Sequence, residues 1–165
     1  MGARLTAVRK ILRWPDPRLT SICEPVTADA RDLAADMLAT MYSACGRGLA
    51  APQVGVLLRL FVMDATWKAG SPAPQVFVNP AVVWLSEARA LGPEGCLSIP
   101  GVTTEVERAR EIRLRWYDLD GAAHEETLTG FSAICAQHEY DHLDGRLTLD
   151  HLTPQARAIA IGAIK

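Results

Sequence analysis

The chain has 165 residues, which suits one domain of ordinary size, and hydrophobic residues make up 49% of it, enough for a sizeable core. A formal net charge of −2 argues against a nucleic-acid or membrane-surface protein, and no apolar run is long enough to span a bilayer. Four widely spaced cysteines without a Cys-x-x-Cys pair exclude a disulfide framework. No signal-peptide pattern is present, so we expect a cytoplasmic protein with a single domain over residues 1–165.

The first predicted helix follows an irregular, extended stretch. Thr27 or Asp29 could cap it, and Gly46 would end it after about four turns. Asp36 and Thr40 lie off its apolar stripe. That stripe recurs every fourth residue, at Leu33, Met37, Met41 and Cys45.

A loop of small residues, 46–55, comes next and carries one polar side chain among apolar neighbours, Gln53. The following stretch has the β-branched and alternating pattern of strands. Asp120 and Gly121 can turn the last of these strands into a hairpin. The predicted strands are residues 56–63, a strand around 76–83 that breaks at Asn79-Pro80, residues 102–107, residues 112–117 and residues 122–128.

Residues 130–143 are predicted to form the helix around which the fold is built. His138 and His142 are four residues apart and therefore lie on one helical face, where both imidazoles can reach a single metal ion. Glu139 follows the first histidine and can reach a water molecule at that ion. Gly145 suits a left-handed helix end, and Thr153 with a proline after it opens a last short helix.

The order of these elements predicts an α+β fold, with antiparallel β-sheets packed around a central metal-binding helix. A catalytic metal needs a third protein ligand. Position 148 is Thr148, which excludes the extended three-histidine pattern of one protease class. Asp144, Asp150 and His151 lie just past the helix, and Cys135 is on the same helix, which would rarely present three ligands. Cys96 is left, in a segment flanked by glycine.

Three stretches together carry a family resemblance. Residues 46–53 (GRGLAAPQ), 94–98 (EGCLS) and 137–142 (QHEYDH) resemble the three motifs of peptide deformylases, in the same order. The resemblance covers nearly the whole chain. It implies a hydrolase that removes the formyl group from the N-terminal formylmethionine of new bacterial proteins.

The resemblance also implies roles for individual residues. Cys96, His138 and His142 would hold one metal ion, typically Fe²⁺, which Zn²⁺, Ni²⁺ or Co²⁺ can replace. The ion lowers the pKa of its water ligand, and Glu139 takes and returns the proton. The backbone N–H of Leu97 and the amide of Gln53 would stabilise the oxyanion.

The substrate would be an N-formylmethionyl nascent peptide, which the protein would bind at the ribosome. We expect the protein to be a monomer that binds neither nucleic acid nor membrane. Its methionine pocket would be lined by Phe131, Ile134 and Cys135, with Gly48 and Arg47 along the peptide. Arg47 and Thr103 depart from the family pattern, in which the first position is usually apolar and the second is often arginine.

Three other functions remain open on the sequence. A related hydrolase could act on another small formyl amide. A metal-binding module without catalysis would need neither Glu139 nor Gln53, because a structural site closes its fourth position. A general metalloprotease lacks its third histidine here, and no glutamate follows Glu139.

Overall fold

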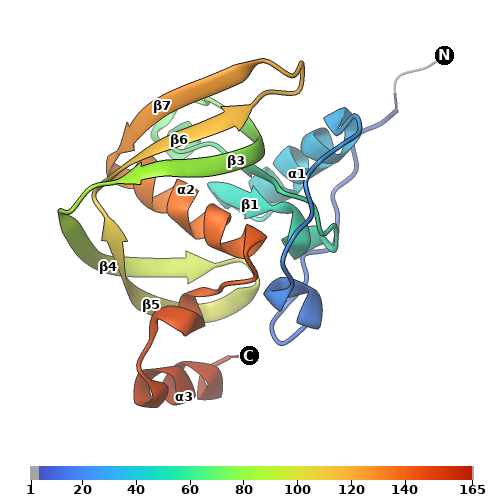
Figure 1. The fold of residues 1–165 in the computed structure, drawn as a ribbon. Helices are drawn as coiled ribbons and strands as arrows, with labels where there is room; N and C mark the ends of the chain where they lie inside the picture. The colour runs from blue at the N-terminus through green and yellow to red at the C-terminus, as the bar shows by residue number, and fades with distance from the viewer. Residues whose placement is uncertain (1–3, 165) are drawn as a thin grey trace.

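The fold surrounds one helix with two antiparallel sheets, as the sequence predicted (Figure 1). The structure, a computed structural model, describes residues 4–164. Helix α2 (Gly130–Leu143) lies between a five-stranded sheet and the β4–β5 hairpin. Its predicted bounds are correct, and its end is fixed by Gly145, where φ is +70° and a Cβ would come within 2.6 Å of the Thr20 carbonyl oxygen.

The five-stranded sheet has the order β1-β2-β3-β6-β7. Every neighbouring pair in it is antiparallel. Its strands are β1 (Gly48–Ala50), β2 (Leu60–Met63), β3 (Gln75–Leu85), β6 (Glu111–Tyr117) and β7 (Ala123–Thr129). The second sheet pairs β4 (Arg89–Cys96) with β5 (Ile99–Ala109).

Side-chain packing and one glutamine fix α2 against both sheets. Phe61 and Phe77 from β2 and β3 are fully buried in the cluster that also takes in Ala136 of the helix. Gln137 donates to the Ala109 carbonyl oxygen over 2.9 Å and accepts from the Ala109 N–H over 3.2 Å. The end of β5 is therefore held directly against the helix that carries the predicted metal ligands.

The first helix differs from its prediction at both ends. Helix α1 (Arg31–Ser43) is capped at Ala30, although Asp29 does accept the N–H of Arg31. It stops before Cys45, which has a φ of +56° and is exposed, so Cys45 is not part of the buried stripe. Met37 and Met41 are buried as predicted.

The polar residues expected off the stripe of α1 are also buried, because the N-terminal segment covers them. Asp36 and Thr40 are each only 1% exposed. Asp36 bonds Arg4 at 2.7 Å, Arg9 at 2.9 Å and the Ala7 N–H at 2.8 Å. These bonds outweigh the cost of burial and lower the pKa of Asp36 to about 2, the Ala7 bond contributing most.

Several strand boundaries also differ from the sequence prediction. Strand β2 is shorter than residues 56–63, and β1 lies inside the predicted loop. Strand β3 continues through Asn79 and Pro80 with a shift of register instead of breaking. Strand β4 was missed because glycine and proline dilute its pattern. The hairpin at Gly121, where φ is +83°, forms as predicted.

The C-terminal part folds as short helices. They are η4 (Thr148–His151), which packs against β5, and α3 (Pro154–Gly162), which Thr153 caps by accepting the Ala156 N–H. The remaining 3-10 turns are η1 (Pro17–Thr20), η2 (Ala51–Val54) and η3 (Trp67–Ala69). Over residues 4–164, no helix combines the length and apolar character needed to cross a membrane.

Candidate metal centre and active site

The structure brings Cys96, His138 and His142 together, with one potential ligand atom of each within 4.8 Å of the others. The two histidines are one turn apart on α2, and their ring centroids are 5.1 Å apart. Cys96 ends strand β4, and its Sγ is 3.6 Å from Nε2 of His142. Helical spacing therefore supplies two of the side chains and a strand end supplies the third.

The electrostatics of this cluster favour metal binding. Burial opposes ionisation of Cys96, but the His142 and His138 rings outweigh it and hold the pKa of the thiol well below its usual range. A thiolate and two imidazoles are a donor set that Fe²⁺, Co²⁺, Ni²⁺ and Zn²⁺ all accept. The residues present therefore fit such an ion.

Glu139 is the buried carboxyl beside this cluster. It is 4% exposed, and among residues 4–164 no hydrogen-bond partner is found for its Oε2. Burial raises the pKa of Glu139. Its Oε1 lies against Gly48, where an added Cβ would be only 2.6 Å away. The absence of a side chain at Gly48, in the first motif, thus leaves the space that the Glu139 carboxylate occupies.

Gln53, the single polar side chain of the small-residue loop, also faces the cluster. Its Oε1 accepts the Ala50 N–H over 2.9 Å, which fixes the orientation of the amide. Its Nε2 then points towards Cys96 Sγ, 3.8 Å away, and donates to Ser98 Oγ over 3.1 Å. The contacts of its amide oxygen and nitrogen thus direct the Gln53 N–H towards the candidate site.

A pocket of about 670 Å³ opens beside these groups. It is lined by Cys96, Leu97, His138, Glu139 and Gln53 together with the five predicted substrate-binding residues, Arg47, Gly48, Phe131, Ile134 and Cys135. His142 lies behind the lining and is 1% exposed. Most of the predicted site residues, from four separate segments, thus face one cavity.

Phe131, on α2, lies at the edge of this pocket and is 38% exposed. The guanidinium of Arg47 lies over its ring, 3.7 Å from the centroid. Such a cation–π contact orders both side chains at the edge of the pocket.

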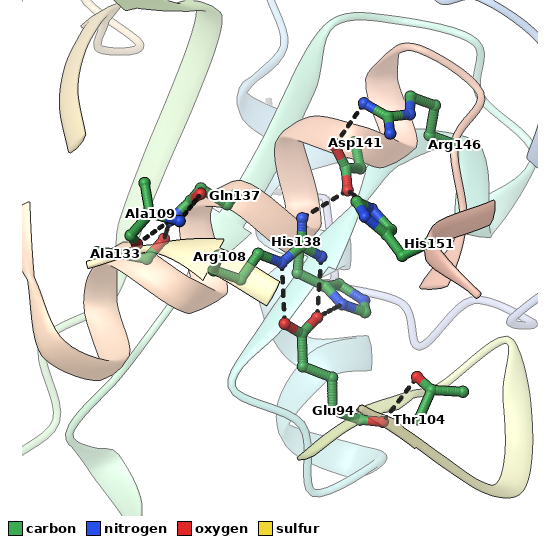
Figure 2. A network of polar contacts seen from close by, with 10 residues as sticks. All are labelled: Glu94, Thr104, Arg108, Ala109, Ala133, Gln137, His138, Asp141, Arg146 and His151. Atoms are coloured by element: carbon green, nitrogen blue, oxygen red, sulfur yellow. Dashed lines mark hydrogen bonds and ion pairs between the residues drawn. The ribbon is translucent and has the colours of Figure 1, made fainter. Parts of the chain in front are cut away.

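Glu94 and Arg108 are functional candidates that the sequence prediction missed. His138 Nδ1 bonds Glu94 Oε1 over 2.9 Å, and Arg108 clamps the same carboxylate with two bonds of 2.9 Å (Figure 2). Burial opposes the charge on Glu94, but Arg108 and His138 lower its pKa to about 2, so the ionised carboxylate accepts a hydrogen bond from Nδ1–H of His138. This leaves Nε2 of His138 for the metal.

A signal for Glu94 was present in the sequence. Residues two apart in a strand share a face, so Glu94 precedes Cys96 on the side that meets the helix. The same alternation applies to Arg108, which shares a face of β5 with the buried Val102 and Val106 and is 5% exposed, but it lies just past the predicted strand at 102–107.

Comparison with known proteins decides the family. Residues 8–158 match the family model described as polypeptide deformylase. The chain belongs to this family. A peptide deformylase from Afipia carboxidovorans is 50% identical over 154 residues, which are 92% of this chain and 90% of that protein. The deformylase family and its metal-dependent hydrolase class, both predicted from the motifs, are confirmed.

Solved deformylase structures share the fold. The enzyme from Legionella pneumophila aligns with a TM-score of 0.90 at 42% identity, covering 95% of this chain and 93% of that one. The peptide deformylase from Ehrlichia chaffeensis in complex with actinonin aligns with a TM-score of 0.89 at 35% identity, covering 95% of each chain. The predicted α+β architecture is confirmed by these neighbours.

Proposed function

We propose that the pocket beside Cys96, His138 and His142 removes the formyl group from N-formylmethionyl peptides and releases formate. Deformylation is the reaction of the family, and we carry over to this chain's residues the roles that the three motifs imply. The observation that carries it is the convergence of a Cys-His-His cluster, a buried carboxyl and an oriented amide on one cavity.

In this proposal Cys96, His138 and His142 hold one Fe²⁺ ion, which Zn²⁺, Ni²⁺ or Co²⁺ can replace. When bound, the ion supplies a Lewis acid that lowers the pKa of a water ligand. Glu94 supports the arrangement, because its bond to Nδ1 keeps His138 in the tautomer with a free Nε2 lone pair.

Glu139 acts as general base and then as general acid. It accepts a proton as water oxygen adds to the formyl carbon, and it delivers that proton to the nitrogen as the C–N bond breaks. Its burial and raised pKa suit a group that must take up a proton and release it again. The products are formate and a free N-terminal amine.

Gln53 and Leu97 stabilise the charge that develops on the formyl oxygen. The Gln53 amide is a neutral donor aimed at the site, and Leu97 follows the ligand Cys96 at the turn between β4 and β5. A carboxylate at position 53 would repel the oxyanion, whereas each donor is worth roughly 10²–10³ in rate.

The substrate side chain would enter between Phe131, Ile134 and Cys135, with Gly48 and Arg47 along the peptide. All five line the cavity. A nascent formylmethionyl chain as substrate implies that the protein works in the cytoplasm, near the ribosome. We further propose that it acts as a monomer and as a single domain, which size-exclusion chromatography with light scattering and limited proteolysis test.

The decisive assay is formate release from formyl-Met-Ala-Ser by protein loaded anaerobically with iron. We expect turnover that falls by about 10²–10⁴-fold in Glu139→Gln, because general-base help is lost. The variant should keep its metal, since Glu139 is not among the proposed ligands. Near-normal turnover in metal-replete Glu139→Gln would refute the role of Glu139.

The same assay distinguishes the proposed peptide deformylase from the remaining alternative, a hydrolase of other small formyl amides. Arg47 and Thr103, which depart from the family pattern, both line the cavity. Faster formate release from small non-peptide formyl amides than from formyl-Met-Ala-Ser would favour that alternative. A peptide preference would support the proposed substrate.

A further inference from the structure

A chain of buried and half-buried polar contacts runs from His138 to the segment that follows helix α2 (Figure 2). Arg108, which clamps Glu94, also donates from Nη1 to Asp141 Oδ2 over 2.7 Å. His151 Nε2 bonds the same oxygen over 2.8 Å. Four elements therefore meet: β4, β5, α2 and the 3-10 turn η4, which His151 ends.

We propose that His151 is a positioning residue for the metal centre, acting on His138 through Asp141, Arg108 and Glu94. The inference rests on the proposed ligand role of His138. It gives the C-terminal turn η4 a function beyond covering strand β5.

The geometry shows how the effect would travel. Arg108 presents a rigid planar fork, with two bonds to Glu94 on one side and one bond to Asp141 on the other. Glu94 Oε1 accepts hydrogen bonds from both Arg108 Nη2 and His138 Nδ1. A movement of the Arg108 guanidinium therefore shifts the Glu94 carboxylate, and with it the hydrogen-bond acceptor of the His138 ring.

His151 fixes the outer end of this chain. Asp141 Oδ2 accepts from both Arg108 and His151, whereas among residues 4–164 its Oδ1 has only the largely exposed Arg146, at 3.9 Å. Without a donor at position 151, the carboxylate can turn outward to Arg146 and leave the Arg108 bond. The side chains of Arg108 and Asp141 are 5% and 14% exposed, so bulk water has little access to the contact between them.

The test measures cobalt binding in three variants. His151→Phe keeps an aromatic ring but removes the donor, and His151→Gln restores an N–H. The matched control is His124→Phe, because His124 forms a similar pair with Asp118, 2.7 Å long, on the β6–β7 hairpin. Each protein is loaded with Co²⁺, and the ligand-field spectrum and the rate of transfer to a chelator are recorded.

We expect His151→Phe to lose cobalt roughly tenfold faster than wild type, at the low end of the effect on metal affinity of losing a partner of a ligand, and to show shifted ligand-field bands. His151→Gln and His124→Phe should behave like wild type. If His151→Phe does not fold, His151→Leu serves as the variant without a donor and is compared with His151→Gln in the same way.

The control measurements separate a positioning role from a structural one. A lower melting temperature of the metal-free protein, with unchanged spectrum and release rate, would overturn the inference and leave the proposed function intact. A wild-type protein without a thiolate-to-cobalt charge-transfer band would instead refute the proposed ligand set itself.

Discussion

The contact between Gly48 and Glu139 gives a sharp test of the proposed general base. Gly48 belongs to strand β1, where its backbone could accept any L-residue, so only space forbids a side chain there. An alanine Cβ would lie 2.6 Å from Glu139 Oε1, 3.0 Å from Glu139 Cδ and 2.9 Å from Cys135 Sγ. Gly48→Ala therefore acts directly on the carboxylate, at the part of the cavity wall where both residues lie.

The size of the effect follows from these distances. Ordinary contact begins at 3.4 Å, so the carboxylate oxygen has to retreat by about 0.8 Å from its position at 2.6 Å. A misplacement of about 1 Å costs about 10²-fold in rate. We expect Gly48→Ala to reduce the turnover number about 100-fold and to keep its metal, because none of the proposed ligands lies within the new contacts.

The assay is formate release from formyl-Met-Ala-Ser, with metal content measured on the same samples. Gly162→Ala is the control, since Gly162 lies in α3 outside the cavity lining and its Cβ would meet none of the described atoms within 4 Å. Adding Cys135→Ala to Gly48→Ala removes the sulfur contact, and turnover should stay low. Wild-type turnover in Gly48→Ala, or full recovery in the double variant, would refute the reasoning.

Three further outcomes are expected. Gln53→Leu should lower the turnover number by roughly 10²–10³-fold with a smaller change in KM, and an effect on KM alone would make Gln53 a ground-state contact. Cys96→Ala should abolish the thiolate-to-cobalt band and nearly all activity while Cys135→Ala keeps the band, and the reverse pattern would overturn the ligand assignment. The pKa of Asp36 is lowered to about 2 from 3.8, so its ionic stabilisation is complete above pH 3.8 and is lost as the pH falls towards 2. Asp36→Asn should therefore be less stable in urea at neutral pH, with a difference from wild type that shrinks over this acid range; a constant difference would contradict the assigned role.

Part of the fold could be predicted because local patterns dictated it. The 3.6-residue period, Gly145 and the Thr153-Pro154 pair gave α2 and the start of α3. The strand predictions failed where glycine and proline hide the alternation, as in β4. They also failed in β3, where a bulge lets the strand continue past Pro80. The ends of helices and strands depend on contacts with segments far away in the sequence. For this reason the sequence pattern placed Cys45 in the first helix, whereas the structure ends that helix before it.

The sequence by itself determined the chemistry that is available. His138, Glu139 and His142 are placed by helical spacing alone, and the three motifs together identified the family before any distance was known. These inferences hold because they depend on residues near one another in the chain or on motif identity, neither of which requires knowledge of packing.

Only the tertiary structure decided which distant groups meet. Pairing of β4 with β5 and their packing on α2 bring Glu94 and Arg108 to His138, and the packing of β1 on α2 places Gly48 against Glu139. The N-terminal segment likewise turns the polar side of α1 into a buried one at Asp36. The partners of a charged side chain come from segments far away in the sequence, and no local period encodes which groups they are.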